Sequence, residues 1–350
     1  MNTDLYTPPT EPPGLFDRAL LTLINDERDL PFVHLILGCL SWAAVGVGLF
    51  FSGPYLWYLA PVYLAVWALV FLDRFILMLH CTSHRMLFKK EHGWMNQLIP
   101  WAVGPFFGET PETYFSHHMG MHHPENNLHD DLSTTMPYRR DSLAAWLHYY
   151  TSFLFTGLAR LAKYHLEHGN RKMFTRTVVG EGIFILACVG LAMLNPGATL
   201  VVFVVPVVLV RLLMMAGNWG QHAFVDGSDP ANAYKNSITC INTRYNKRCF
   251  NDGYHIHHHV RARTHWSEMP AEFENNKAEY GRQDAIVFEG VDFFQVWMML
   301  MLKRWDALAD RFVQLPGAPV RDRTQVIEFL KTRVQPIPAA TLTADPAPAE

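Results

Sequence analysis

Histidine is concentrated in four short stretches of this sequence, at spacings that suit metal binding. HCTSH places two histidines four residues apart, HHMGMHH holds four more, NWGQH ends in one, and HIHHH holds another four. The clustered residues are His80, His84, His117, His118, His122, His123, His222, His255, His257, His258 and His259. Neutral imidazole is the commonest side-chain metal ligand, so these stretches are the candidate chemistry of the chain.

Helical geometry predicts which histidines of HIHHH act together. At about 100° per residue, His255, His258 and His259 fall within one stripe, whereas His257 points to the opposite side. An extended strand would instead align His255, His257 and His259. In HHMGMHH the same helical calculation accepts His117 as well as its neighbours.

The number of ligands indicates more than one ion. A single metal ion takes about four to six ligands, so nine clustered nitrogens suit two ions. Imidazole suits iron, copper, nickel and zinc, and the residue type alone does not choose among them.

Four apolar segments are long enough to cross a membrane. They are expected at about residues 33–52, 55–79, 178–195 and 199–217. The linker GP follows the first segment and PGA follows the third, so the four segments are expected to form two helical hairpins. Shorter apolar stretches at 93–108, 143–161 and 284–300 are interrupted by polar residues; the first two are expected to be interfacial helices, whereas the third has no assigned place.

Charge predicts how the hairpins are oriented. Neither hairpin turn contains Lys or Arg, whereas residues 80–177 contain several, including Arg85, Lys89 and Arg139. The positive-inside rule then places both termini and all the histidine clusters on the cytoplasmic face. With 50% hydrophobic residues, 17% charged residues and a net charge of −3, the chain has no electrostatic footprint for nucleic acid.

The predicted fold is therefore an all-α integral membrane protein. It has four transmembrane helices in two hairpins, with interfacial helices and a cytoplasmic histidine-rich cap. Residues 1–30 are expected to be an N-terminal cytoplasmic tail that lacks a signal peptide. Residues 31–270 form the membrane domain, 271–334 cytoplasmic or interfacial helices, and 335–350 a disordered tail.

The spacings resemble those of the membrane fatty acid desaturase and hydroxylase superfamily. That superfamily has HxxxH, HxxHH or HxxxHH, and HxxHH boxes around two transmembrane hairpins, matched here by the boxes beginning at His80, His118 and His255. The stearoyl-CoA desaturase type adds NxxxH, matched by Asn218 and His222. The resemblance covers about residues 30–270, and its spacing selects His118 in preference to His117.

This resemblance implies a set of metal ligands and a chemistry. The implied ligands of two iron ions are His80, His84, His118, His122, His123, His222, His255, His258 and His259, with Asn218 acting through a water. The implied reaction is O2-dependent desaturation of a fatty acyl lipid. Two electrons would come from a separate ferredoxin, rubredoxin or cytochrome b5 with its reductase, because the chain has no CxxC or HPGG sequence. The cytoplasmic membrane of a bacterium is the expected location.

Other polar residues are predicted to support this site. His117, Asn126, Asn127, Asp130 and Asp131 are candidates to hydrogen-bond the ligands, although an Asx-rich loop explains the asparagines and aspartates equally well. His165 and His168 are expected on a solvated helix face, the alternative being a small site of their own.

Two charges fall inside the apolar segments. Asp73 and Arg211 each precede a box residue by seven positions and are predicted to pair within the membrane. Local pairing of Asp73 with Arg74, and snorkelling of Arg211, is the alternative.

Two other functions remain alternatives. A hydroxylase or ketolase of the same scaffold, acting on alkane, lipid or carotenoid, would use the same residues. A histidine-rich metal transporter is more remote, because a transporter needs ligands near the bilayer centre and these clusters lie beyond the span ends. A zinc metalloprotease is disfavoured because no HExxH occurs.

Overall fold

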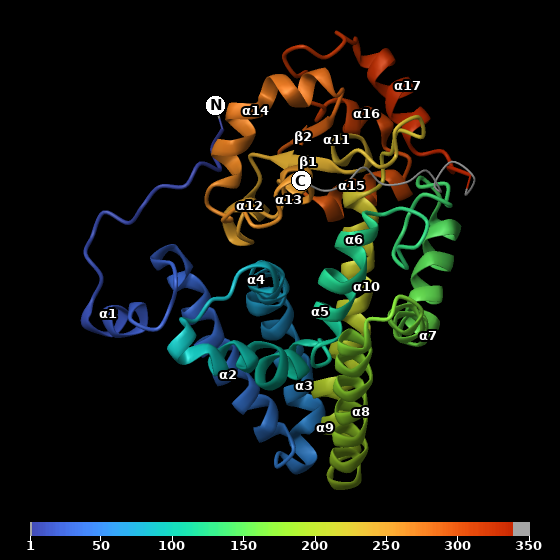
Figure 1. The fold of residues 1–350 in the computed structure, drawn as a ribbon. Helices are drawn as coiled ribbons and strands as arrows, with labels where there is room; N and C mark the ends of the chain where they lie inside the picture. Colours follow the sequence, from blue (N-terminus) through green and yellow to red (C-terminus); the bar gives the residue numbers. More distant parts are fainter. Residues whose placement is uncertain (1, 339–350) are drawn as a thin grey trace. The chain divides into compact units, whose positions relative to one another are not determined.

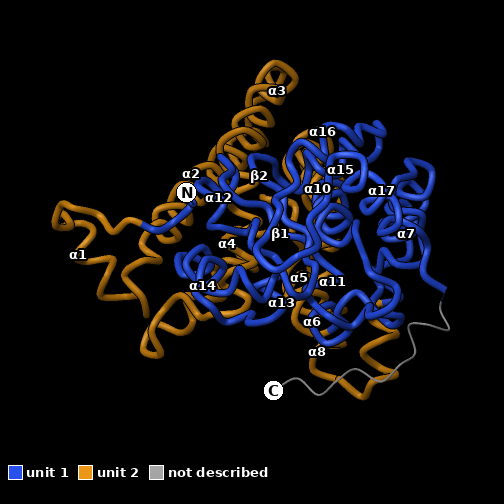
Figure 2. Tube along the Cα trace, turned by 90° about the horizontal axis from the view of Figure 1, so that it is seen from above, with its two compact units in different colours: residues 1–6, 121–160, 212–350 blue, residues 7–120, 161–211 orange. Residues whose placement is uncertain are grey.

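A computed structural model describes residues 2–338 of the chain. The chain divides into two compact units, shown in different colours in Figure 2. Unit 1 comprises residues 1–6, 121–160 and 212–350, and unit 2 comprises residues 7–120 and 161–211. The first residues of the expected N-terminal tail belong to unit 1, where the side chains of Asn2 and Asp4 are buried.

Unit 2 contains the apolar helices of the N-terminal half (Figure 1). They are α1 (Leu15–Leu21), η1 (Glu27–Asp29), α2 (Leu30–Leu49), η2 (Gly53–Tyr55), α3 (Leu56–Val66), η3 (Trp67–Leu72) and α4 (Asp73–His84). Helix α2 packs on α3, η3 and α4. Three residues separate α2 from η2, so the linker is as short as the sequence predicts.

The second part of unit 2 brackets the polar segment that follows α4. This segment forms η4 (Lys90–Gln97), η5 (Ile99–Val103), η6 (Gly104–Phe107) and α5 (Thr113–His117). Helix α8 (Arg171–Leu194) packs on α5, and Gly180 makes this possible because a Cβ there would lie 1.9 Å from the carbonyl oxygen of Pro111. One residue, Asn195, separates α8 from α9 (Pro196–Thr199), and its side chain caps α9 by accepting a hydrogen bond from the Ala198 backbone.

Four helical segments are long and apolar enough to cross a membrane. They are Glu27–Leu49, Gly53–His84, Arg171–Leu194 and Pro196–Gln221. The last continues from α9 through η8 (Leu200–Val204) and α10 (Val205–Gln221). Large apolar side chains on α8 are exposed, as lipid-facing residues would be: Ile183, Ile185, Leu186, Val189, Met193 and Leu194. These spans correspond to the four predicted ones, but the second and fourth contain a π-helical turn, at η3 and η8, that the sequence did not reveal.

Unit 1 is helical around a small parallel sheet. Its elements are α6 (His123–Glu125), most of α7 (Leu143–Glu167), the end of α10, α11 (Ala233–Asn236), α12 (Arg244–Arg248), α13 (His255–Val260), α14 (Met269–Arg282), α15 (Phe293–Met301), α16 (Trp305–Ala309) and α17 (Arg323–Arg333). Strands β1 (Ile238–Ile241) and β2 (Ile286–Glu289) pair in parallel, with Ile238 opposite Ile286. The all-α prediction is wrong in this detail, because a four-residue apolar run cannot be distinguished from a buried helix by its periodicity.

Two further expectations need correction in unit 1. The apolar stretch 284–300 consists of β2 and α15, and α15 begins with a capping box between Asp292 and Gln295. The start of the expected disordered tail is packed, since Ile337 is buried against Leu128, Met136 and Val225. The remainder of that tail, from residue 339, lies outside the described residues.

Candidate metal centre

Unit 2 brings three box histidines together. His80 and His84 lie one turn apart at the end of α4, and His118 begins the π-helical turn η7 (His118–His122). The Nε2 atoms of His84 and His118 are 2.9 Å apart, and the ring centroids of His80 and His118 are 4.7 Å apart. One ligand atom from each of the three lies within 4.8 Å of the others, so this trio forms a candidate metal-binding group within unit 2.

Unit 1 contains a second group, formed by residues far apart in the sequence. His122, His222 and His259 place their ligand atoms within 4.8 Å of one another. His255 joins them, with its Nε2 3.2 Å from Nε2 of His222 and 3.0 Å from Nε2 of His259. These histidines come from η7, the residue after α10, and α13.

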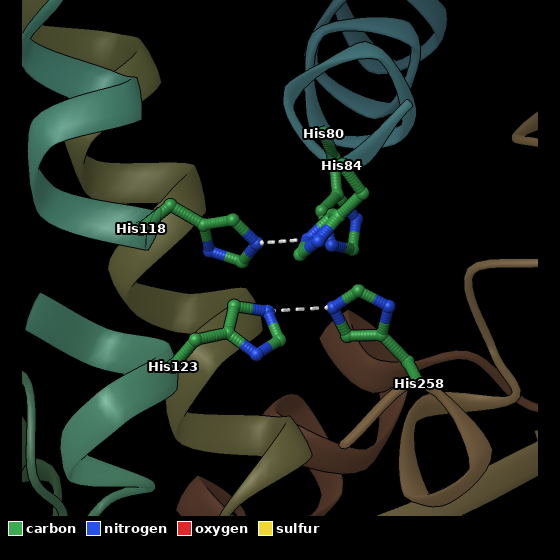
Figure 3. Close-up of side chains that lie close together, drawn as sticks. All are labelled: His80, His84, His118, His123 and His258. Atoms are coloured by element: carbon green, nitrogen blue, oxygen red, sulfur yellow. Dashed lines mark hydrogen bonds between the residues drawn. The ribbon is translucent and has the colours of Figure 1, made fainter. Parts of the chain in front are cut away.

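Unit 1 also contains a close histidine pair. The Nε2 atoms of His123 and His258 are 2.9 Å apart, and their ring centroids are 4.8 Å apart. Figure 3 draws this pair of unit 1 and the His84–His118 pair of unit 2, each joined by a dashed line. All nine histidines predicted as ligands therefore have at least one other predicted ligand close by within their own unit.

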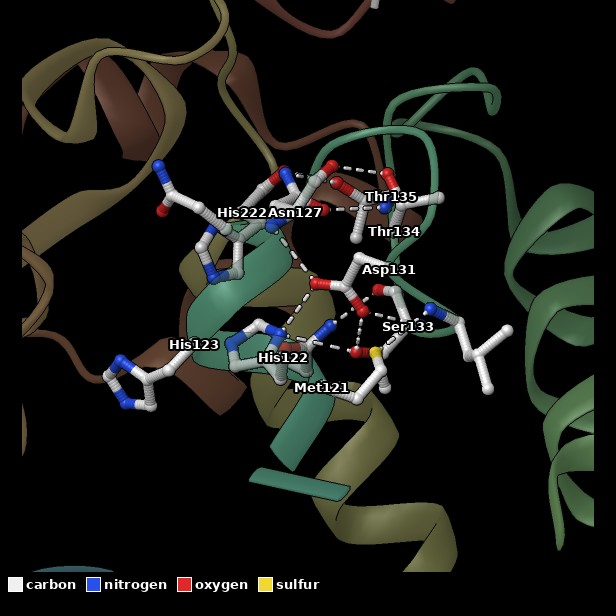
Figure 4. Close-up of polar contacts among 12 residues, drawn as sticks. Met121, His122, His123, Asn127, Asp131, Ser133, Thr134, Thr135 and His222 are labelled. Atoms are coloured by element: carbon white, nitrogen blue, oxygen red, sulfur yellow. Dashed lines mark hydrogen bonds and ion pairs between the residues drawn. The ribbon is translucent and has the colours of Figure 1, made fainter. Parts of the chain in front are cut away.

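Two of the unit 1 histidines have their tautomer fixed by a neighbour. Nδ1 of His222 lies 2.8 Å from the carbonyl oxygen of Asn236, so Nδ1 carries the proton and donates it. Nδ1 of His122 likewise donates to Asp131 Oδ2 at 2.7 Å (Figure 4). Both rings therefore present an unprotonated Nε2, the nitrogen that a metal ion would bind.

Burial keeps these imidazoles neutral. It lowers the pKa of His222 to about 3, with repulsion from His122 adding to the effect and the Asn236 carbonyl opposing it. Burial also lowers the pKa of His259 well below its usual range, assisted by His255, His222, His123 and His122. Neutral imidazole is the form that binds a metal ion.

The distances between the nitrogens fit ligands of a common ion. Two nitrogens bound at about 2.1 Å and at right angles to each other would lie about 3.0 Å apart. The Nε2 separations of 2.9 to 3.2 Å agree with this value. Since His255 Nε2 faces two other Nε2 atoms, of which His222 Nε2 has no proton, a bound cation satisfies all three lone pairs better than shared protons do. The donor set therefore fits an imidazole-bound transition metal such as iron.

His257 differs from its neighbours on α13. Its Nε2 is 2.9 Å from Thr264 Oγ1, outside both histidine groups of unit 1. The region 255–260 is helical, as predicted, and the helix separates His257 from His255, His258 and His259. In the second box, His118 belongs to the unit 2 trio, and His117 does not.

The loop after the second box supports the ligands unevenly. Asp131 is 1% exposed and hydrogen-bonds His122, and it also accepts hydrogen bonds from Ser133 and the Asn127 backbone. The Asn127 side chain hydrogen-bonds Thr135, and Asn126 donates to the Ala231 carbonyl. Asp130 pairs with exposed His129. Thus Asp131 is the one of these four for which a hydrogen bond to a candidate ligand side chain is recorded.

The intramembrane charges have a partner that the sequence analysis did not consider. Arg211 forms an ion pair with Glu181 of α8 at 3.1 Å, and the same Glu181 oxygen accepts a hydrogen bond from Thr110. Asp73 accepts a hydrogen bond from the backbone of Arg74. The pairing of Asp73 with Arg211 remains a prediction, and Glu181 was missed because pairing was sought only between residues in register with the boxes.

His165 corrects another expectation. It was placed on a solvated face, but its side chain is completely buried, with Nε2 2.9 Å from Ser116 Oγ. Ser116 in turn contacts Thr177 Oγ1 at 2.5 Å. Only His168 is exposed as expected, and it stacks on Tyr164. Residues three apart on α7 can differ in this way because α7 continues to Glu167, beyond the predicted end at 161.

The comparison with known protein families agrees with the histidine pattern. A family model described as fatty acid desaturase matches residues 55–290 of the 350-residue chain. The chain belongs to the fatty acid desaturase family. Its members are oxidoreductases that act on lipids, and with four candidate spans this chain is an integral membrane protein. No curated protein and no solved structure that was compared matches the chain.

Proposed function

We propose that this protein is an O2-dependent di-iron desaturase of fatty acyl lipids. The observation that carries the proposal is the convergence of Nε2 atoms from His222, His255 and His259, with the protons of His222 and His122 held on Nδ1. Family membership supplies the lipid substrate class.

The proposed iron ligands are the nine histidines, three from unit 2 and six from unit 1. Asn218 is proposed to act through a water. Bound iron would supply reductive activation of O2 and abstraction of hydrogen from an unactivated C–H bond. The balanced reaction converts –CH2–CH2–, O2, two electrons and two protons into –CH=CH– and two water molecules.

The residues of the chain prepare this site before any metal binds. The Asp131 carboxylate and the Asn236 carbonyl oxygen hold the rings of His122 and His222 in one orientation and one tautomer. Burial of His222, His255 and His258 excludes water from the imidazoles. The proposed electron donor is a separate ferredoxin, rubredoxin or cytochrome b5 with its reductase, and the proposed location is the bacterial cytoplasmic membrane, with the site on the cytoplasmic side.

The test is lipid analysis of a host that expresses the wild type or His258→Ala. Mass spectrometry should detect acyl chains that have lost two hydrogens only with the wild type and only in the presence of O2. An O2-dependent gain of one oxygen would instead identify a hydroxylase. Metal flux into vesicles with no oxidised product would favour a transporter and contradict the proposal.

A further inference from the structure

A tyrosine outside the histidine boxes contacts the amide that is proposed to hold a metal-bound water. Tyr149 lies on α7 and is 3% exposed. Its hydroxyl donates a hydrogen bond to the carbonyl oxygen of Ser133 at 3.0 Å and accepts one from Asn218 Nδ2 at 2.7 Å. No spacing motif in the sequence includes this tyrosine.

These contacts fix which way the Asn218 amide faces. Nδ2 donates to the Ser133 carbonyl at 3.0 Å as well as to Tyr149. A carbonyl oxygen only accepts hydrogen bonds, so rotating the amide by 180° would place Oδ1 against another acceptor. Both Nδ2 hydrogens are thereby used, and Oδ1 is the amide atom left to accept a hydrogen bond from a water.

Ser133 connects this amide to the histidine group of unit 1. Its hydroxyl donates to Asp131 Oδ1 at 2.6 Å, and Asp131 Oδ2 holds His122 (Figure 4). The main chain of Ser133 therefore orients Asn218 while its side chain supports the residue that orients His122. Tyr149 completes this arrangement by occupying the second Nδ2 hydrogen.

We infer that Tyr149 is a positioning residue, which turns Asn218 Oδ1 toward a water on one metal ion of the centre. This inference rests on the proposed di-iron site, and it goes beyond it by assigning a residue of α7 to one of the two ions. The aromatic ring has a separate packing role, against Trp219 at 5.0 Å and Tyr138 at 5.7 Å between centroids. Replacement by phenylalanine keeps the ring and removes only the hydroxyl.

The experiment measures metal binding by the full chain in detergent. Metal-free wild type, Tyr149→Phe, Asn218→Ala and the double variant are titrated anaerobically with Fe2+, and melting of each metal-free protein is recorded. Tyr149→Phe should weaken one of the two equivalents by about 10- to 100-fold, as is typical for residues that orient metal ligands. Tyr138→Phe is the matched control, because its ring packs in the same cluster and its hydroxyl has no recorded bond to Asn218.

The double variant distinguishes positioning from general stabilisation. If Tyr149 acts through Asn218, adding Tyr149→Phe to Asn218→Ala should weaken iron binding no further. Equal weakening in both backgrounds, weakening of both equivalents, or unchanged affinity in Tyr149→Phe would overturn the inference.

Failure of the proposed function gives a different result. Wild type that binds two equivalents of Fe2+ with the predicted variant pattern, yet forms no double bond in lipids, would refute the desaturase and retain the role of Tyr149. Wild type that binds no Fe2+ would refute both.

Discussion

At the scale of single residues, hydrogen bonds on the far side of each imidazole distinguish the histidines of unit 1. His122 and His222 each commit Nδ1 to an oxygen, and their Nε2 atoms are left for a metal. His257 instead commits Nε2 to Thr264. Neighbouring histidines on one helix therefore have different chemical prospects.

This difference predicts unequal effects of substitution along α13. His257→Ala should retain most of the iron of the purified protein, because its ring faces Thr264. His255→Ala should lose iron from the group that contains His222 and His259, because its Nε2 contacts both. Metal analysis of both variants, with circular dichroism to verify helix content, is the measurement. Equal losses would show that ring orientation on α13 does not select the ligands.

At the scale of elements, a close approach of backbones sets the end of α10, where Asn218 and His222 flank Gly220. A Cβ on Gly220 would lie 2.3 Å from the carbonyl oxygen of Phe293, the first residue of α15. The ring of Phe293 contacts His255 at 5.8 Å between centroids. Glycine at this position lets α15 pack directly on the end of α10.

Gly220→Ala should therefore push α15 away from α10 and destabilise unit 1. The expected loss is about 1–3 kcal/mol, as for overpacked sites, and iron content should fall with it. Gly217→Ala is the control on the same helix, because a Cβ there meets nothing within 4 Å. The control should be neutral or slightly stabilising, since alanine favours helix. Matching melting temperatures for the two variants would contradict the close approach.

The junction before α5 contains a buried carboxyl group with an unusual pKa. Burial raises the pKa of Glu109 to about 8, with Arg211 opposing this shift and Glu181 adding to it. Its Oε1 is buried and has no hydrogen-bond partner among the described residues. The folded protein thus holds this proton more tightly than the unfolded chain does.

The consequence is a loss of stability at high pH. Because the pKa of Glu109 is raised on folding, its contribution is fully present below about pH 4.5 and disappears as the pH rises through about 8. The melting temperature of the detergent-solubilised protein should fall between pH 6 and 9, and Glu109→Gln should reduce this fall. Exposed Glu91→Gln is the control and should leave the slope unchanged. A slope that is identical in wild type and Glu109→Gln would argue against the buried carboxyl.

At the scale of the whole chain, one arginine joins segments that are far apart in the sequence. Arg140 is completely buried, and its guanidinium donates to carbonyl oxygens of six residues. These are Thr135, Met136, Tyr138, Ala223, Arg333 and Gln335. It therefore fastens the C-terminal segment to the loop that carries Asp131 and Ser133.

Arg140→Lys should destabilise the protein although it keeps the charge. Lysine has one nitrogen and no planar fork, so several buried carbonyls would lose their donor, at about 1–3 kcal/mol each. Thermal unfolding and limited proteolysis after residue 323 are the measurements. Arg139→Lys, at an exposed site paired with Asp141, should have little effect. Similar stability of the two variants would show that the carbonyls find other donors.

Local sequence determined much of this protein. Apolar length predicted the four spans, helical spacing separated His257 from its neighbours, and the second histidine box indicated that Asp131 might hold a ligand. Such features depend on residues close in sequence, whose geometry is set by the period of a helix.

Only the tertiary structure decided the contacts between distant segments. Examples are Tyr149 with Asn218, Glu181 with Arg211, His165 with Ser116, and β1 with β2. No local period encodes these pairs, because each depends on how separate elements pack. The π turns at η3, η7 and η8 add a second reason: they change the number of residues per turn, so a helical calculation at 100° per residue fails across the second histidine box.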